Sequence, residues 1–274
     1  LKYLKKIVPE IKLKNVKSGQ KVFDWKIPLE WNVKDAYILN LKSKKKFAEF
    51  KKNNLHLMGY SQPVNKIVKF NELKNKIFSN KRYPNQIPYM TSYYEKKWGF
   101  CLSYNQLNKL PKGDYKVHVN STLRKGKMDY GEVLIKGKSK REIFFSTYIC
   151  HPSLANNELS GPLLTTFLIS QIKKNFKKTK FSYRFIFIPE TIGAIAYIKK
   201  NLKVLRKNML AGYVISCVGD DRNYSHVESR MGNTLADQSL EASFIGLKNS
   251  KKYSFLKRGS DERQYCSPGI DLPV

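Results

Sequence analysis

The apolar positions of the chain follow one pattern before about residue 130 and another after it. From there onward, short and nearly continuous apolar runs alternate with longer amphipathic stretches. The runs predict strands at 131–135, 142–149, 182–188 and 209–218, and the amphipathic stretches predict helices at 161–176 and 191–202. Strands that alternate with helices and are apolar on both faces predict a mainly parallel sheet covered on both sides. The predicted fold class is therefore an α/β three-layer sandwich.

Residues 22–118 have a different character. They contain all three tryptophans and 17 of the 35 aromatic residues, in short alternating stretches such as 32–39 and 54–60 that prolines interrupt. Such stretches predict short strands, and one amphipathic helix is predicted over 71–79. We therefore expect a small, mainly β domain at 22–118. It would be nested between residues 1–21 and residues 119–274, which together would form the α/β domain.

The composition is that of a folded protein. Of the 274 residues, 41% are hydrophobic and 13% aromatic, which excludes a disordered basic tail. The four cysteines are widely spaced and include no Cys-x-x-Cys pair, so we expect a reducing, cytoplasmic compartment. The sequence contains no signal peptide and no apolar run of the roughly 20 residues that span a bilayer. Because the chain starts at Leu1 and ends in a strand-like segment at 271–274, we expect it to be a fragment.

The net charge of +31 first suggests a partner such as nucleic acid or an acidic membrane. However, 43 of the 52 basic residues are lysines, whereas proteins that read phosphates and bases rely on the planar fork of arginine. The charge is also uneven, because residues 142–172, 208–247 and 259–274 together contain ten acidic residues and only three basic ones. Nucleic acid is therefore the least favoured partner.

Polar residues follow three of the predicted strands. His151 and the segment 156–161 follow the strand at 142–149, Glu190 follows the strand at 182–188, and Asp220 follows the strand at 209–218. Ligands of open α/β sheets bind beyond the carboxyl ends of the strands, so we expect these side chains to lie at one edge. A neutral imidazole with nearby carboxylate or amide oxygens can coordinate zinc, and a separate glutamate can act as a general base.

Each of these residues also has a purely structural interpretation. His151 suits a strand end, and the turn before Ser160 suits the start of a helix. Glu190 gains electrostatically from the helix that follows it. The polar segment 258–269 is either a loop that lines a pocket or a solvated turn. The coincidence of three strand ends favours a functional site.

The motifs occur in a recognisable order: His151, then Asn-Asn-Glu-Leu-Ser-Gly at 156–161, Glu190 before Gly193, and Gly-Ser-Asp-Glu at 259–262. This order resembles the zinc-dependent aminopeptidase superfamily, which includes glutaminyl cyclases and glutamate carboxypeptidases. The segments TSYYEKKWGFCLS, STYICHPSLANNELSGP and GSDERQYCSPG resemble, more specifically, a bacterial group of aminopeptidase-like proteins of unknown function. In that group a small domain is nested in the aminopeptidase fold, and a winged helix follows. Its genes tend to accompany surface-polysaccharide synthesis.

The resemblance implies metal ligands and a catalytic residue. His151 matches the first zinc histidine, and Glu190 matches the general base. Asn157 stands where a bridging aspartate is expected, with Glu158 beside it, and Asp220 is the available substitute for a further ligand aspartate.

Two departures from the superfamily pattern limit the number of metal ions. Thr191 replaces a ligand glutamate, and Ser216 and Cys217 stand where another ligand aspartate is expected. The last ligand histidine would lie beyond Val274. We therefore expect one zinc ion rather than two.

Three functions remain open at this point. The first is a zinc-dependent aminopeptidase-like hydrolase of an amide or peptide bond, in which Glu190 is the general base and substrate is bound by the segment that contains Asp261, Glu262, Arg263 and Tyr265. The second is a degenerate member that binds or modifies an amino-sugar or amino-acid conjugate for surface-polysaccharide synthesis. The third is the nucleic-acid binder. An oligomer is compatible with the sequence.

Overall fold

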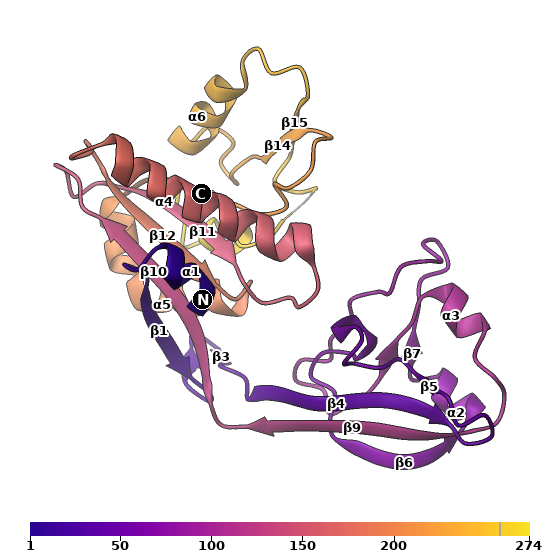
Figure 1. Cartoon of the computed structure of the whole chain (residues 1–274). Helices are drawn as coiled ribbons and strands as arrows, with labels where there is room; N and C mark the ends of the chain where they lie inside the picture. The colour runs from indigo at the N-terminus through magenta and orange to yellow at the C-terminus, as the bar shows by residue number, and fades with distance from the viewer. Residues whose placement is uncertain (258) are drawn as a thin grey trace. The chain divides into compact units, whose positions relative to one another are not determined.

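The computed structural model describes residues 1–257 and 259–274, which form two compact units (Figure 1). The first unit contains Leu1–Val16, Gln20–Ile27 and Met128–Val274. The second contains Lys17–Gly19 and Pro28–Lys127. Each unit has its own hydrophobic core.

The first unit is built on a five-stranded sheet in the order β1-β10-β12-β11-β13. Its strands are β1 (Lys12–Lys17), β10 (Lys127–Ile135), β11 (Glu142–Tyr148), β12 (Ser182–Ile188) and β13 (Met209–Val214). β11 runs parallel to both β12 and β13, whereas β10 runs antiparallel to β12. The sheet is therefore mixed, and its parallel part consists of β11, β12 and β13, which are connected by helices.

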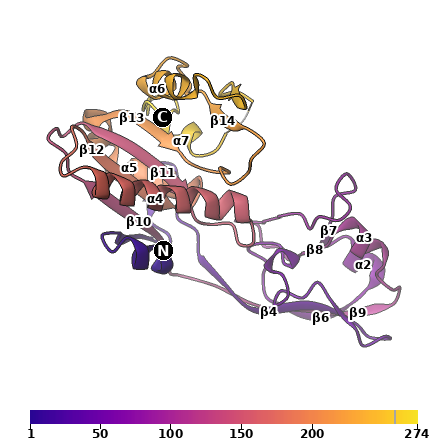
Figure 2. The same cartoon turned by 45° about the horizontal axis from the view of Figure 1, so that its top comes forward.

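Helices cover both faces of this sheet (Figure 2). Side chains of β12 alternate between the faces, so that Phe185 and Phe187 pack with Ile169 of one helix, while Ile186 and Ile188 pack with Tyr197 of another. The two helices are α4 (Gly161–Asn175) and α5 (Ile192–Asn208). This arrangement confirms the predicted α/β fold with helices on both faces of the sheet.

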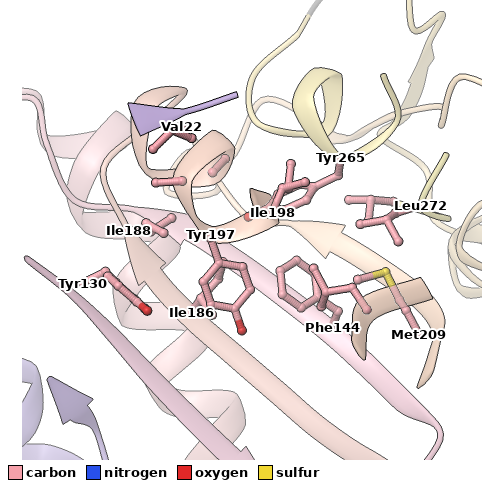
Figure 3. Close-up of a cluster of buried hydrophobic side chains, with 14 of the residues drawn as sticks. Val22, Tyr130, Phe144, Ile186, Ile188, Tyr197, Ile198, Met209, Tyr265 and Leu272 are labelled. Atoms are coloured by element: carbon pink, nitrogen blue, oxygen red, sulfur yellow. The ribbon is translucent and has the colours of Figure 1, made fainter. Parts of the chain in front are cut away.

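The core beneath α5 gathers residues from distant parts of the sequence (Figure 3). Val22 from an N-terminal strand and Leu272 near the C-terminus are both buried there. The ring of Phe144 lies 5.1 Å from that of Tyr265 and 6.3 Å from that of Tyr197, measured between centroids. The segment around Tyr265 is thus fixed to the sheet by aromatic packing.

The smaller elements of the first unit surround the sheet. They are α1 (Lys2–Ile7), β2 (Lys21–Val22), β3 (Trp25–Lys26), β14 (Tyr224–Val227), α6 (Leu235–Phe244), β15 (Ser250–Tyr253) and α7 (Glu262–Tyr265). β2 and β3 pair with each other, as do β14 and β15. The helix α6 begins with a capping box between Thr234 and Asp237. None of the helices in the described residues is long and apolar enough to cross a membrane.

The second unit contains a four-stranded sheet in the order β5-β4-β9-β6. Its elements are β4 (Glu30–Asn40), β5 (Lys46–Phe47), η1 (Asn54–His56), β6 (Val64–Lys69), α2 (Phe70–Lys74), β7 (Ile77–Phe78), β8 (Phe100–Cys101), α3 (Tyr104–Asn108) and β9 (Asp114–Arg124). β4 pairs antiparallel with β9 along nearly its whole length. The buried side chains of this sheet, among them Ile38 and Val117, form the second core.

Two local predictions in this unit are wrong. The predicted strand at 54–60 begins instead with the 3₁₀ turn η1, because the side chain of Asn53 caps it by accepting from the backbone of Leu55. The predicted helix at 71–79 ends at Lys74, because the following residues pair with β8 as strand β7. Pairing between segments distant in sequence overrides the local pattern here.

The second unit also differs in extent from the nested domain predicted at 22–118. It starts at Pro28, apart from the short segment Lys17–Gly19, and ends at Lys127. β9 is one continuous strand whose last residue, Arg124, pairs with Glu30 at the start of β4. Because β4 and β9 stay paired to their ends, a domain boundary at residue 118 would cut through β9 in the middle of a continuous antiparallel pair.

A group of buried charges lies near the amino ends of β11 and β12. The guanidinium of Arg184 makes two hydrogen bonds to Glu142, at 2.6 and 2.8 Å, and also pairs with Glu132. Glu132 additionally accepts from the hydroxyl of Tyr197 at 2.7 Å and pairs with Lys14. Two carboxylates thus face two cations, and we call these five residues the Arg184 network.

Candidate functional site

The carboxyl ends of β11 and β12 place His151 beside Glu190. Tyr148 and Ile188 are register partners in these parallel strands, and Ile149 donates its N–H to the carbonyl of Ile188 at 3.1 Å. The chains that follow therefore leave the sheet at the same edge. There, Nε2 of His151 lies 3.5 Å from Oε2 of Glu190. The sequence predicted this proximity from the strand ends alone.

Glu158 approaches the other nitrogen of the same imidazole. Its Oε1 lies 2.5 Å from Nδ1 of His151, and its Oε2 accepts from the backbone N–H of Cys150. Glu158 belongs to a π-helical turn, η2 (Asn156–Ser160), that leads directly into α4. Such wide turns are frequent at functional sites. The turn brings a largely buried carboxylate over the strand end that carries His151.

The protonation of His151 depends on these acids. Burial alone lowers the pKa of the imidazole, but the hydrogen bond to Glu158 and the charges of Glu158, Glu190 and Asp261 outweigh it, so the net pKa is raised. A carboxylate on Nδ1 also fixes the orientation of the ring. His151 thus directs Nε2 towards Glu190.

Glu190 is held by its backbone and by its side chain. Its N–H donates to Sγ of Cys150 at 3.1 Å, and its Oε1 accepts from the hydroxyl of Ser260 at 2.7 Å. The second oxygen, Oε2, is the atom that faces His151. The side chain of Glu190 is 25% exposed, compared with 11% for His151, so solvent reaches this carboxylate.

Asp261 is a fully buried carboxyl group close to the same acids. Its Oδ1 accepts from the N–H of Thr191 at 2.7 Å, while Oδ2 has no hydrogen-bond partner among residues 1–257 and 259–274. Burial, followed by the charges of Glu190, Glu262 and Glu158, raises the pKa of Asp261 to about 8. Two carboxylates, Glu158 and Glu190, already face the single imidazole of His151, so the surroundings disfavour a further negative charge on Asp261.

Asn157 lies in the π-helical turn and is partly satisfied. Its amide nitrogen donates to the hydroxyl of Tyr148 at 3.2 Å and lies 3.6 Å from Sγ of Cys217. Its Oδ1 is buried without a hydrogen-bond partner in the described part of the chain. A buried and unpaired amide oxygen is an electron-pair donor available to a cation or to a water molecule.

Asp220 contacts other residues than the ones around His151. It forms a two-point ion pair with Arg222, with N–O distances of 2.9 and 3.1 Å, and accepts from the side chain of Asn156 at 3.1 Å. The hydrogen bonds of Arg222 hold the pKa of Asp220 well below its usual range. A metal-binding role for Asp220 stays a prediction that these contacts do not support, because its oxygens are already engaged by Arg222.

The segment predicted to bind substrate is mostly buried. The hydroxyl of Tyr265 lies 3.2 Å from that of Ser146 inside the core, and Glu262 accepts from the N–H of Ser260 at 2.7 Å. Arg263 lies over the ring of Phe255, with its guanidinium carbon 5.5 Å from the centroid. Arg258, the first residue of the polar segment 258–269, lies outside the described residues. These contacts are structural, so direct binding of substrate by Glu262, Arg263 and Tyr265 stays an unsupported prediction.

Sequence reasoning missed three contributors to the site: Cys150, Thr191 and Ser260. Cys150 precedes His151 and receives the N–H of Glu190, and Ser260 precedes Asp261, so adjacency to a predicted site residue was the available signal. Thr191 has a left-handed backbone, with φ of 60°, which a β-branched residue rarely adopts. Composition and periodicity contain no signal for that conformation.

The donor set is suited to a divalent cation. One atom each of Cys150, His151 and Glu158 lie within 4.8 Å of one another, and Glu190 and Asn157 add oxygens at the same edge. Burial and then the charge of Glu158 raise the pKa of the Cys150 thiol, which disfavours its thiolate. The imidazole and the oxygens are thus the better ligands, and the excess negative charge favours a cation at this edge.

Known proteins that are similar in sequence match this chain over nearly its whole length. A Clostridium acetobutylicum protein, provisionally named a polysaccharide biosynthesis protein with an aminopeptidase-like domain, is 44% identical over 273 residues. The match covers 99% of this chain and 62% of that protein. A crystal structure of a peptidase candidate from the same organism has 43% identity and a TM-score of 0.94, and the match covers 100% of this chain and 64% of that one. The chain thus spans about three-fifths of the length of these relatives.

More distant structures share the fold. A peptidase M28 precursor from Shewanella amazonensis has a TM-score of 0.63 at 13% identity, covering 100% of this chain and 76% of that one. A zinc aminopeptidase from Bacillus subtilis has a TM-score of 0.57 at 11% identity, covering 92% of this chain and 70% of that one. The chain thus has an aminopeptidase-like α/β fold. The profile of one family matches residues 1–274, and the chain belongs to that family, whose description is domain of unknown function DUF4910.

Proposed function

We propose that the chain forms the site of a metal-dependent hydrolase of amide bonds, with Glu190 as the general base. The observation that supports this proposal most strongly is the pair of atoms at the strand ends: Nε2 of His151 and Oε2 of Glu190 lie 3.5 Å apart in a cluster with excess negative charge. The aminopeptidase-like fold of the relatives supports the same reaction class.

Zinc is the proposed cofactor, and His151 and Asn157 are the residues proposed to hold it. His151 would donate through Nε2, and the unpaired Oδ1 of Asn157 would be a second donor. Glu158 is already engaged with Nδ1 of His151, so its proposed role is to orient the imidazole and increase its basicity. Bound zinc would supply Lewis acidity that polarises the substrate carbonyl and lowers the pKa of water.

Glu190 would transfer the protons of the reaction. Its Oε2 faces His151 and is partly exposed, so the carboxylate can take a proton from an attacking water molecule. The same group would return the proton to the amine that leaves. The bond from Ser260 to Oε1 leaves Oε2 as the oxygen that accepts the proton. The cluster of acids would also attract a substrate that carries an ammonium group.

The experiment is hydrolysis of a panel of aminoacyl p-nitroanilides by the purified protein, with and without the chelator 1,10-phenanthroline. We expect chelator-sensitive turnover, and we expect Glu190→Gln to lower kcat by about 10²–10⁴-fold, the usual contribution of general base catalysis. Glu241→Gln is the matched control, because Glu241 is a half-exposed residue of α6 paired with Lys252. Turnover that is insensitive to the chelator, or equal rates for Glu190→Gln and the unaltered protein, would refute the proposal.

A second candidate is a member of the fold that binds or modifies an amino-sugar or amino-acid conjugate without hydrolysing peptides. It is favoured by Asn157, which places an amide where an acidic ligand is expected, and by the polysaccharide biosynthesis named for the Clostridium acetobutylicum relative. Saturation-transfer NMR with glucosamine and N-acetylglucosamine separates the two candidates. Binding of these sugars that persists in Glu190→Gln, with no anilide turnover, would favour the second.

A further inference from the structure

The turn between β12 and α5 is strained at one residue. Thr191 has φ of 60° and ψ of −73°, a conformation that a β-branched side chain disfavours. Thr191 lies directly after Glu190, so the backbone angles of Thr191 set the direction in which the chain leaves the proposed base. Gly193 follows at a point where an added Cβ would lie 2.5 Å from the side chain of Ile188. The turn therefore has little room to relax.

Two consecutive residues from a distant part of the chain contact this turn. Ser260 donates its hydroxyl to Oε1 of Glu190 at 2.7 Å, and Asp261 accepts the N–H of Thr191 through Oδ1 at 2.7 Å. One residue thus fixes the side chain of Glu190, and the other fixes the peptide group that follows it. Both bonds join segments 70 residues apart in sequence.

The Ser260–Asp261 pair is itself anchored to the core. The N–H of Ser260 donates to Glu262, and the carbonyl of Asp261 accepts from the N–H groups of Gln264 and Tyr265 at 3.0 and 3.1 Å. Tyr265 is fully buried, and its hydroxyl lies 3.2 Å from that of Ser146 on β11. The pair is therefore held against the strand that leads to His151.

We propose that Ser260 and Asp261 are positioning residues that hold Glu190 towards His151, Asp261 by stabilising the left-handed conformation of Thr191 and Ser260 by binding one carboxylate oxygen. This inference rests on the proposed function of Glu190. It replaces the substrate-binding role that the sequence predicted for Asp261, since a fully buried carboxyl engaged with Thr191 acts on the reaction through its neighbour.

The first test measures the coupling between Asp261 and Thr191 and needs no activity. Glycine adopts a left-handed backbone without strain, so Thr191→Gly removes the need for the bond to Asp261. At one fixed pH, we expect the Tm of Asp261→Ala to lie about 3–8 °C below that of Asp261→Asn, since both variants lack the titratable carboxyl, and we expect less than half this difference in the Thr191→Gly background. Asp261→Asn keeps an acceptor for the Thr191 N–H and is the conservative control. Equal Tm differences in both backgrounds would overturn the role assigned to Asp261.

The second test measures kcat and KM separately on the anilide that gives the fastest turnover. We expect Ser260→Ala and Asp261→Ala to lower kcat by about 10-fold or more with little change in KM, because misplacing a base weakens the transition state and not substrate binding. Ser260→Thr and Asp261→Asn should restore most of the rate. A change in KM alone, or no rescue by the conservative variants, would show that the pair only fills space.

The two tests separate this inference from the proposed function. If Glu190→Gln leaves hydrolysis unchanged, the proposed function fails, whereas the Tm coupling between Asp261 and Thr191 is still expected. If Glu190→Gln abolishes hydrolysis but Ser260→Ala and Asp261→Ala do not lower kcat, the proposed function stands and the positioning role is wrong.

Discussion

The same strands of the first unit carry buried charges at both ends, and the two groups differ in their balance. At the amino ends, the Arg184 network sets two carboxylates against two cations. At the carboxyl ends, His151 faces the carboxyl groups of Glu158 and Glu190, with Asp261 nearby. One group is neutral overall, whereas the other has excess negative charge.

This difference in charge balance shifts the pKa of one buried carboxyl group in each cluster, and the two shifts have opposite directions. Burial raises the pKa of Glu132, but its bonds to Lys14 and Tyr197 and the charge of Arg184 outweigh burial and lower it overall. Burial likewise raises the pKa of Asp261, and its acidic neighbours raise it further, to about 8. The charges of the network thus compensate one another, whereas the excess of acids at the site favours the binding of a cation or a proton.

Breaking the balanced group should have the largest effect on stability. Arg184→Leu leaves Glu132 and Glu142 buried without their main cation, and we expect it to lower the free energy of unfolding by about 3–5 kcal/mol at neutral pH. Urea unfolding measures this change. Arg141→Leu is the control, because Arg141 is an exposed residue just before β11, and it should change the free energy by about 0.5 kcal/mol or less. A cost below about 1 kcal/mol for Arg184→Leu would contradict the structural role of the network.

Replacing Asp261 in the negatively charged group at the carboxyl ends should change the free energy of unfolding by less, and this change should depend on pH. The folded-state pKa of Asp261 is about 8, and its ordinary value is 3.8, so between these values the folded chain binds one proton more than the unfolded chain. The stability that comes from this proton is full below pH 3.8 and is lost as pH rises towards 8. The loss approaches about 1.4 kcal/mol per pH unit.

Asp261→Asn removes this titration and keeps an acceptor for the N–H of Thr191. Relative to the unaltered protein, the variant should therefore gain stability steadily between pH 5 and pH 7, by about 1.4 kcal/mol per unit. Urea unfolding at pH 5, 6 and 7 measures the difference. If the difference in unfolding free energy between the variant and the unaltered protein stays constant across this range, the pKa of Asp261 is not raised.

The smallest effect is expected at the exposed acid outside the cluster. Asp220 is engaged by Arg222 and Asn156, so Asp220→Asn should change neither the Tm nor the affinity for zinc. Isothermal calorimetry with zinc tests this, with His151→Ala as the variant in which affinity should fall. A tenfold or greater loss of zinc affinity in Asp220→Asn would restore Asp220 as a ligand and extend the site beyond the cluster around His151.

The sequence was sufficient to predict the fold class and the edge of the sheet at which His151 and Glu190 meet. Apolar strands that alternate with amphipathic helices give the α/β class, and parallel strand ends bring His151 and Glu190 together because Tyr148 and Ile188 are in register. Topology brings these two residues to the same edge of the sheet. The orientation of their side chains depends on the loop contacts of Glu158, Ser260 and Asp261.

The remaining parts of the site depend on contacts that periodicity does not encode. The left-handed conformation of Thr191 is stabilised by Asp261, a residue 70 positions away, and Asp220 is drawn to Arg222 two residues further along its own loop. The helix predicted at 71–79 is shortened because β7 pairs with β8. Contacts distant in sequence thus decide the conformation of Thr191 and the end of the helix, and a local ion pair decides the partner of Asp220.

We propose that the cluster of His151, Glu158 and Glu190 binds a divalent cation through His151, with Glu190 beside it as the base. The most direct measurement is calorimetric titration of the metal-free protein with zinc, in parallel with His151→Ala and with Arg141→Leu as a control outside the cluster. We expect one zinc ion per chain, with an affinity that falls by at least about tenfold in His151→Ala and is unchanged in Arg141→Leu. No zinc binding, or equal binding by the unaltered protein and His151→Ala, would contradict it.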